Sequence, residues 1–238
     1  MNNIQNTDVR LIDLGLMEYQ QAWDIQTGYF DAIIRRKLAN REGPEEPTDN
    51  YLILCEHPHV FTLGKSGNES HLVIPKDQLG SIRASYHQIN RGGDITYHGP
   101  GQLVVYPILD LENFFTDIHR YMRALEEVVI LTLQDFGISA TRYPGLTGVW
   151  LDPDVPGRAR KICAMGVKTS RWVTLHGLAL NVNTDLNYFN YIVPCGISDK
   201  AVTSIEKEAG RSFQLSDVGE AVQRHFQSVF GAQLVATI

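Results

Sequence analysis

The sequence predicts an α+β domain in which helices flank a core of mixed or antiparallel strands. Segments with apolar residues three or four positions apart indicate helices, and short apolar runs bounded by glycine and proline indicate strands. These segments do not follow the regular strand, helix, strand order of a doubly wound sheet. No repeat, low-complexity tract or internal linker divides the chain, so we expect residues 1–238 to form a single domain.

The first two helices are predicted from apolar spacing and from end signals. Apolar residues recur every three or four positions over residues 18–40, which predicts an amphipathic helix with one buried stripe. The second helix is expected to follow an N-cap at Thr116 or Asp117 and to stop at Gly137.

Two further helices are predicted in the C-terminal part of the chain. Residues 216–230 carry a helical apolar stripe, with Ser216 as the candidate N-cap. A short helix is expected over Ser198–Ile205. Apolar runs predict the strands, which are residues 51–56, 103–109, 148–151, 161–168 and 174–182.

Composition and charge restrict the class of function. Of the 238 residues, 43% are hydrophobic, which suffices for a sizeable core. The formal net charge is −6, from 21 Lys and Arg against 27 Asp and Glu, and this disfavours general binding to nucleic acid or to a membrane surface.

The chain is also expected to reside in the cytosol. It has no apolar run near the length that spans a bilayer and no secretory signal at its polar N-terminus. Its three cysteines, Cys55, Cys163 and Cys195, are odd in number and far apart, which fits free thiols in a reducing compartment.

A glycine-rich segment directly before the strand at Leu103 is the densest candidate for a binding site. Glycine lets the main chain approach a ligand closely, and polar and aromatic side chains surround the glycines here. The spacing matches neither a dinucleotide fingerprint nor a phosphate loop, so no nucleotide is required. The candidate residues are Arg91, Gly92, Gly93, Asp94, Ile95, Thr96, Tyr97 and His98.

Cys195, held between a proline and a glycine, is the candidate nucleophile. An unperturbed thiol has a pKa near 8.5, so a nucleophilic role needs a neighbouring cation, and Lys161 is the candidate. Strand alternation is expected to put Lys161, Cys163 and Met165 on one face. Sequence spacing alone does not pair Lys161 with Cys195. The apolar neighbours of Cys163 favour a structural role for that thiol.

A metal site at Cys55, His57 and His59 is a weaker alternative. These residues alternate and would share one face of a strand. Pro58 interrupts that strand, however, and no fourth ligand follows nearby. We therefore expect no metal at this place.

Five motifs together resemble the lipoyl(octanoyl) transferase family, also called lipoate-protein ligase B. The resemblance spans residues 51 to about 205. His59 and Asp94 stand at positions where the family varies or often has another residue. The motifs are Glu56-His57-Pro58 with Thr62-Leu63-Gly64, Arg91-Gly92-Gly93 with residues 96–102, Lys161-Ile162, His176 to Asn183, and Pro194-Cys195-Gly196.

The resemblance implies a fold, a reaction and a set of site residues. The fold is the catalytic domain of biotin and lipoate protein ligases, a mixed sheet with helices outside it. The reaction moves an octanoyl group from acyl carrier protein to a lysine of lipoyl domains, without ATP or another cofactor. Cys195 matches the acyl-accepting cysteine, and Lys161 matches the lysine that activates it. The residues expected around the acyl chain are Arg91 to His98, Ala164, Met165, Gly166, Gly177, Leu178 and Ala179.

The implied partners are octanoyl-acyl carrier protein as donor, and the lipoyl domains of 2-oxoacid dehydrogenases and the glycine cleavage H protein as acceptors. Because acyl carrier proteins are acidic, a basic patch is expected over residues 157–171, where Arg158, Arg160, Lys161, Lys168 and Arg171 occur without an acidic residue.

Two alternatives remain. One is an ATP-dependent lipoate or biotin protein ligase of the same fold, which needs no nucleophilic cysteine, so the Pro-Cys-Gly motif disfavours it. The other is a non-catalytic protein that binds lipoyl domains or the carrier. The presence of both Cys195 and Lys161 disfavours this second alternative.

Overall fold

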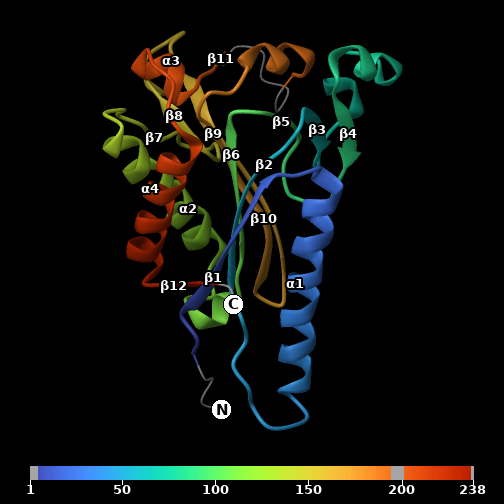
Figure 1. Ribbon diagram of the computed structural model, residues 1–238, viewed down its shortest axis with the longest axis vertical. Helices are drawn as coiled ribbons and strands as arrows, with labels where there is room; N and C mark the ends of the chain where they lie inside the picture. Colours follow the sequence, from blue (N-terminus) through green and yellow to red (C-terminus); the bar gives the residue numbers. More distant parts are fainter. Residues whose placement is uncertain (1–4, 194–200, 237–238) are drawn as a thin grey trace.

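A mixed β-sheet forms the centre of the protein, with helices on both faces (Figure 1). The computed structural model describes residues 5–193 and 201–236. Within them, the strand order of the large sheet is β12-β1-β2-β6-β10-β9-β8-β7, and β11 pairs with β9 outside this path. The strands are β1 (Asp8–Leu16), β2 (Tyr51–Glu56), β6 (Gln102–Ile108), β7 (Thr141–Arg142), β8 (Val149–Leu151), β9 (Arg160–Ser170), β10 (Val173–Asn181), β11 (Ala201–Val202) and β12 (Gln233–Ala236).

The pairing of neighbouring strands confirms the predicted mixed sheet. The edge formed by β12, β1 and β2 is parallel, whereas β2, β6, β10, β9 and β8 pair antiparallel in turn. An α+β fold with such a sheet follows because consecutive strands here are joined by both short turns and long helical connections.

The two faces of the sheet are covered by different helices (Figure 1). Helix α1 (Tyr19–Ala39) packs on one face through residues such as Phe30 and Ile33. Helices α2 (Ile118–Asp135) and α4 (Leu215–Phe230) cover the other face and contribute Leu125 and Phe226 to its core. The short helix α3 (Ile205–Ala209) precedes α4. Alternating strand residues therefore enter two separate cores.

A second, three-stranded sheet lies at the end of α1 where that helix begins (Figure 1). It contains β3 (Val60–Leu63), β4 (Ser85–Gln88) and β5 (Ile95–His98), in the order β4-β3-β5. The sequence did not predict this sheet. Its strands are short and β3 pairs with β4 across the 3₁₀ turns η1 (Glu69–His71) and η2 (Lys76–Ile82), so local periodicity gives little signal.

Most predicted elements are confirmed with small shifts at their ends. The first helix and the strand Tyr51–Glu56 agree with residues 18–40 and 51–56. Asp117 is the N-cap of α2, and its side chain accepts a hydrogen bond from the backbone N–H of Arg120 at 3.0 Å.

Two predictions about the C-terminal part are wrong. Helix α4 begins at Leu215 after Gln214, which makes no side-chain cap, so Ser216 is not the N-cap. Ala201–Val202 form strand β11 rather than helix, because this pair hydrogen-bonds to the start of β9, and Ser204 caps the helix that follows. Residues 198–200 lie outside the described residues.

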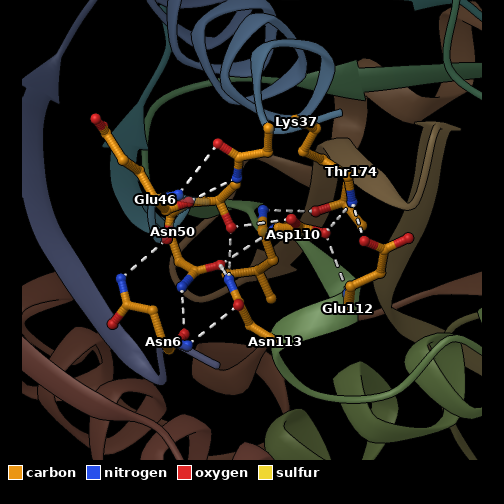
Figure 2. Close-up of polar contacts among 11 residues, drawn as sticks. Asn6, Lys37, Glu46, Asn50, Asp110, Glu112, Asn113 and Thr174 are labelled. Atoms are coloured by element: carbon orange, nitrogen blue, oxygen red, sulfur yellow. Dashed lines mark hydrogen bonds and ion pairs between the residues drawn. The ribbon is translucent and has the colours of Figure 1, made fainter. Parts of the chain in front are cut away.

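A buried polar cluster around Asp110 fastens the chain where β6 ends (Figure 2). Nζ of Lys37, in the last turn of α1, lies 2.5 Å from Oδ1 of Asp110 and 3.0 Å from a carboxylate oxygen of Glu112. Thr48 donates to the second oxygen of Asp110 at 2.9 Å, and Asn50 accepts from the Asp110 backbone N–H at 3.0 Å. These contacts hold the connection between α1 and β2 against the sheet.

Candidate active site

A cavity of about 490 Å³ lies beside strands β6, β9 and β10 and is covered by the glycine-rich segment before β5. Most of the predicted site residues line it, although they come from segments far apart in the sequence. These are Arg91, Gly92, Gly93, Asp94, Ile95, Thr96, His98, Lys161, Ala164, Met165, Gly166, Gly177, Leu178 and Ala179. The pairing of β9 with β10, which sets Gly177 opposite Gly166 and Ala179 opposite Ala164, brings two of these segments together.

Tyr97 is the member of the predicted glycine-rich segment that does not line the cavity. Its ring is fully buried in the core of the three-stranded sheet. Its hydroxyl lies 2.7 Å from Nδ1 of His59, and its ring stacks on Tyr188 at 5.0 Å. Tyr97 therefore supports β5 from behind rather than contacting a molecule in the cavity.

The glycines of the loop allow close backbone packing. A Cβ on Gly166 would lie 2.8 Å from the carbonyl oxygen of Gly92, and a Cβ on Gly64 would lie 2.2 Å from that of Gly93. The backbone N–H of Gly92 donates to the carbonyl of Val167 at 2.9 Å. The loop is thus fixed directly onto β9 and forms a wall of the cavity.

Two charged side chains of the loop hold it in place. Nη2 of Arg91 donates to the carbonyl oxygen and to Oγ1 of Thr62, at 2.7 and 3.0 Å. The carboxylate of Asp94 lies 2.5 Å from Nδ1 of His71. Arg91 and Asp94 therefore both line the cavity and bind neighbouring protein groups.

Lys161 lies in the cavity wall on the face of Trp150. The Lys161 Nζ is 4.6 Å from the centre of the Trp150 ring, a cation–π arrangement, and the two residues are partners across β8 and β9. A Cβ on Gly148 would approach the Lys161 side chain to 3.6 Å and the Cys163 carbonyl oxygen to 2.5 Å. The lysine is held in a tightly packed corner of the cavity.

The predicted common face of Lys161, Cys163 and Met165 is confirmed for Cys163 and Met165, which pair regularly with β10 and pack against the same core. It is wrong for Lys161. Val149 pairs with Cys163 and Trp150 pairs with Lys161, so β9 contains one extra residue at this point. Such a bulge interrupts the alternation of side chains. Cys163 is fully buried in the core under α2 and α4, and this burial raises the pKa of its thiol. Its predicted structural role agrees with that position.

Cys195 lies outside the described residues, which resume at Ala201. Strand β11 pairs in parallel with Arg160 and Lys161, and the backbone N–H of Thr203 donates to the Lys161 carbonyl at 2.9 Å. Ala201 and Val202 line the cavity. The segment a few residues after Cys195 therefore runs beside Lys161.

Three histidines are buried at or near the cavity. His98 and His176 line it, and His57 packs against the ring of Tyr19, another lining residue. Burial lowers the pKa of His57 to about 4, and the pKa values of His98 and His176 to about 3, with nearby Arg91 adding to the effect at the latter two. His57 donates through Nδ1 to the Met17 carbonyl at 2.8 Å. All three rings are neutral near pH 7.

The side chains of the alternative metal site have other partners. His57 Nε2 lies 2.8 Å from the Tyr106 hydroxyl and 3.6 Å from the Cys55 sulfur, whereas His59 turns to Tyr97. Burial raises the pKa of the Cys55 thiol, which disfavours the thiolate that a metal requires. The three residues do not converge on one point.

The structure also brings into the cavity residues that sequence reasoning did not select. Tyr19 begins α1, Tyr106 lies in β6, and Trp150 lies in the short strand β8. His176, at the start of a motif used for the resemblance, lines the cavity with a positive φ of 65°, a conformation costly for a residue other than glycine. The sequence shows that these residues are aromatic, but it does not show that their side chains face the same cavity.

The predicted basic patch does not form as one surface. Arg160 is paired with Asp152 and Glu208, and Arg158 with Asp152. Lys168 lies near the far end of β9, with its Nζ 5.3 Å from the ring of Phe30 on α1. The absence of acidic residues in the segment was misleading, because acidic side chains arrive from other elements.

Comparisons with known proteins give a consistent picture. The lipoyl protein ligase A/B catalytic domain matches residues 19–227. An octanoyltransferase of Cytophaga hutchinsonii is 59% identical over 233 residues, which is 97% of this chain and 96% of that protein. An octanoyltransferase of Christiangramia forsetii is 56% identical over 231 residues, covering 96% and 98% of the two chains.

A solved structure shares the fold. The bi-partite lipoate protein ligase of Thermoplasma acidophilum, studied with its E2 lipoyl domain, superposes with a TM-score of 0.70 at 17% identity and covers 98% of this chain and 88% of that one. Across residues 5–193 and 201–236, no helix has both the length and the apolar character needed to cross a membrane.

Proposed function

This chain belongs to the lipoyl protein ligase A/B catalytic domain family, and from that premise we propose that it is an octanoyltransferase of protein lipoylation. It moves an octanoyl group to the acceptor lysine of a lipoyl domain. Cys195 carries the octanoyl group as a thioester, and Lys161 supplies and receives the proton. The relatives named octanoyltransferase cover nearly the whole chain, which favours this activity over an ATP-dependent ligase.

One observation carries the proposed chemistry. Lys161 lies in the wall of the same cavity as the apolar and glycine residues of β9 and β10, and the segment that follows Cys195 pairs with it. The wall residues Leu178, Ala179 and Ala164 present an apolar surface to an alkyl chain. A cation next to such a surface suits a reaction in which an acyl group with a polar head and an apolar tail is transferred.

The first half-reaction exchanges one thioester for another. The thiolate of Cys195, stabilised by the Lys161 ammonium, attacks the carbonyl carbon of the donor thioester. A bond forms between that carbon and the Cys195 sulfur, and the bond to the donor sulfur breaks. The departing thiolate takes a proton from Lys161. Because one thioester replaces another, the step needs no ATP.

The second half-reaction forms the amide. The neutral amine of the acceptor lysine attacks the thioester carbon, and its proton passes to the now neutral Lys161. The bond to the Cys195 sulfur breaks and the thiolate is restored. We assign stabilisation of the oxyanion of each tetrahedral intermediate to backbone N–H groups of the glycine-rich wall other than that of Gly92, which donates to Val167.

The partners are proposed from the same chemistry. The donor is octanoyl-acyl carrier protein, and the acceptors are the lipoyl domains of 2-oxoacid dehydrogenases and the glycine cleavage H protein. The solved relative from Thermoplasma acidophilum was studied with an E2 lipoyl domain, which supports an acceptor of this class. Reaction in the cytoplasm, where free thiols persist, is part of the proposal.

Intact-mass spectrometry tests the proposal directly. The protein is mixed with octanoyl-acyl carrier protein without ATP, and we expect one octanoyl adduct that disappears when a lipoyl domain is added. Cys195→Ala should form no adduct, whereas the buried thiols provide matched controls, Cys163→Ala and Cys55→Ala, that keep it. An adduct on Cys163, or transfer by Cys195→Ala, contradicts the covalent mechanism. Octanoylation of the lipoyl domain that requires free octanoate and ATP indicates a ligase instead.

A further inference from the structure

Three polar side chains form a buried chain of hydrogen bonds that begins at the cavity wall. His98 lines the cavity, and its Nδ1 lies 2.8 Å from Oε1 of Gln102. Nε2 of Gln102 donates to Oδ1 of Asn181 at 2.9 Å. Nδ2 of Asn181 donates to the backbone carbonyl of Thr203, also at 2.9 Å. All four residues are buried.

The direction of this chain is fixed at its far end. A backbone carbonyl only accepts hydrogen bonds, so Asn181 must turn its amide nitrogen to Thr203 and its amide oxygen to Gln102. Gln102 Nε2 also donates to the carbonyl of Tyr97 at 3.2 Å, which requires the same orientation. Gln102 therefore presents its oxygen to His98, and the hydrogen of the imidazole resides on Nδ1.

The second nitrogen of His98 then carries a lone pair. Nε2 lies at the other edge of the ring from Gln102, 3.5 Å from Oγ1 of Thr62, which already accepts from Arg91 at 3.0 Å. This distance is long for a hydrogen bond. The low pKa of His98, caused mainly by burial, keeps the ring neutral near pH 7. The lone pair thus lies on the side of the ring turned toward the Thr62 hydroxyl and Arg91, and Arg91 and His98 both line the cavity.

The far end of the chain lies beside the proposed catalytic lysine. Thr203, whose carbonyl anchors Asn181, also donates its backbone N–H to the carbonyl of Lys161 at 2.9 Å. The same residue thereby connects the imidazole of His98 to the strand that carries Lys161. A shift of Gln102 or Asn181 would disturb both the tautomer of His98 and its position relative to Lys161.

We propose that Gln102 and Asn181 are positioning residues that hold His98 in the Nδ1–H form, so that its Nε2 accepts a hydrogen bond from an N–H group of the substrate. The proposal rests on octanoyl transfer as the reaction. Two substrate groups have this chemistry, the amide N–H groups of the carrier's pantetheine arm and the neutral amine of the acceptor lysine. The octanoyl chain itself has no donor.

Nitrogen NMR of protein labelled with ¹⁵N-histidine tests the tautomer without any assay of activity. In the wild type we expect His98 to show a protonated Nδ1 and an unprotonated Nε2 that do not titrate from about pH 5 to 8. Gln102→Glu places a carboxylate against Nδ1, which favours the imidazolium and should bring the titration of His98 into that range. Asn190→Asp adds the same charge at an exposed position and should leave His98 unchanged. A wild-type ring protonated on Nε2 overturns the proposal.

Kinetics of the two half-reactions identify the N–H group. His98→Ala and Gln102→Glu are assayed for acylation by octanoyl carrier protein, for acylation by an octanoyl thioester without amide groups, and for transfer from the octanoyl enzyme to a lipoyl domain. Loss of one hydrogen bond to substrate should slow the affected step about tenfold. A larger loss with the carrier than with the amide-free thioester identifies the pantetheine arm, and a larger loss in transfer identifies the acceptor amine.

Two results of these assays count against the proposal. Equal losses in all three assays indicate a purely structural role for the chain, and unchanged rates in all three show that Nε2 binds no substrate group. If the wild type forms no octanoyl adduct, the proposed function is wrong. The NMR experiment tests the tautomer of His98 separately, because it does not depend on activity.

Discussion

Arg160 and Glu208 form an ion pair with two parallel hydrogen bonds, Nε to Oε1 and Nη2 to Oε2, each 2.7 Å long. Nη1 of Arg160 also reaches a carboxylate oxygen of Asp152 at 2.6 Å. The guanidinium of Arg160 holds the pKa of the Glu208 carboxyl below its usual range. This pair fastens α3 to the first residue of β9, next to Lys161.

The first prediction follows from this pair. Arg160→Gln should lower the free energy of unfolding by about 1–3 kcal/mol, because it removes paired, partly buried, charge-assisted hydrogen bonds. Arg158→Gln is the matched control, since that side chain is 66% exposed and has one ion pair at 3.1 Å. It should change stability by less than about 1 kcal/mol. Urea titration measures the free energy of unfolding of both variants. Equal losses would show that the Arg160–Glu208 pair stabilises the fold no more than the exposed ion pair of Arg158 does.

The second prediction concerns the charge of Lys161. Lys161→Ala should shift the pH profile of Cys195 alkylation by iodoacetamide toward that of an ordinary thiol, because the thiolate loses its counter-charge. Lys161→Arg should restore that profile but leave transfer to the lipoyl domain slow, because arginine does not release its proton. Identical alkylation profiles in the wild type and Lys161→Ala would contradict a role for Lys161 in activating Cys195.

The third prediction concerns acid. His57, His98 and His176 are neutral in the folded protein down to about pH 4, 3 and 3, but the unfolded chain protonates them below about pH 6.5. The contribution of these histidines to the free energy of unfolding is therefore fully present above about pH 6.5. It decreases as the pH falls, by about 1.4 kcal/mol per pH unit for each histidine.

A histidine variant checks that assignment. His57→Gln should flatten the dependence of the unfolding free energy on pH between about 6.5 and 4.5, by one bound proton. Urea titrations of the wild type and His57→Gln across this range measure the two slopes, and identical slopes would mean that His57 does not contribute.

The fourth prediction compares two glycines. A Cβ on Gly177 would lie 2.1 Å from the Val105 carbonyl oxygen, so Gly177→Ala must push β10 away from β6 and should cost at least about 1–3 kcal/mol. Gly28, in the middle of α1, has nothing within 4 Å of an added Cβ. Gly28→Ala should stabilise the protein by about 0.5–1 kcal/mol. Thermal or denaturant unfolding measures the stability of both variants. A change of the same sign in Gly177→Ala and Gly28→Ala would contradict this explanation.

Local patterns in the sequence were sufficient for much of the fold and for the family. The helical spacing of residues 18–40 and the apolar run 51–56 give α1 and β2, because each element buries a face that its own periodicity defines. The motifs around Arg91, Lys161 and Gly177 identified segments that do line one cavity. The sequence indicated the chemistry of each motif because its glycine, charged or thiol residues lie within a few positions of one another.

The tertiary structure alone decided the contacts between segments that lie far apart in the sequence. Four features depend on partners from other segments of the chain, and Glu208, for example, is 48 residues from Arg160. They are the three-stranded sheet, the burial of Tyr97 behind β5, the bulge that separates Cys163 from Lys161, and the pairing of Arg160 with Glu208. A residue's own neighbours do not encode such partners, because the free energy of pairing comes from surfaces that meet only after the chain has folded. The sequence by itself determined which residues have the chemistry, and the folded chain decided which of them face the cavity.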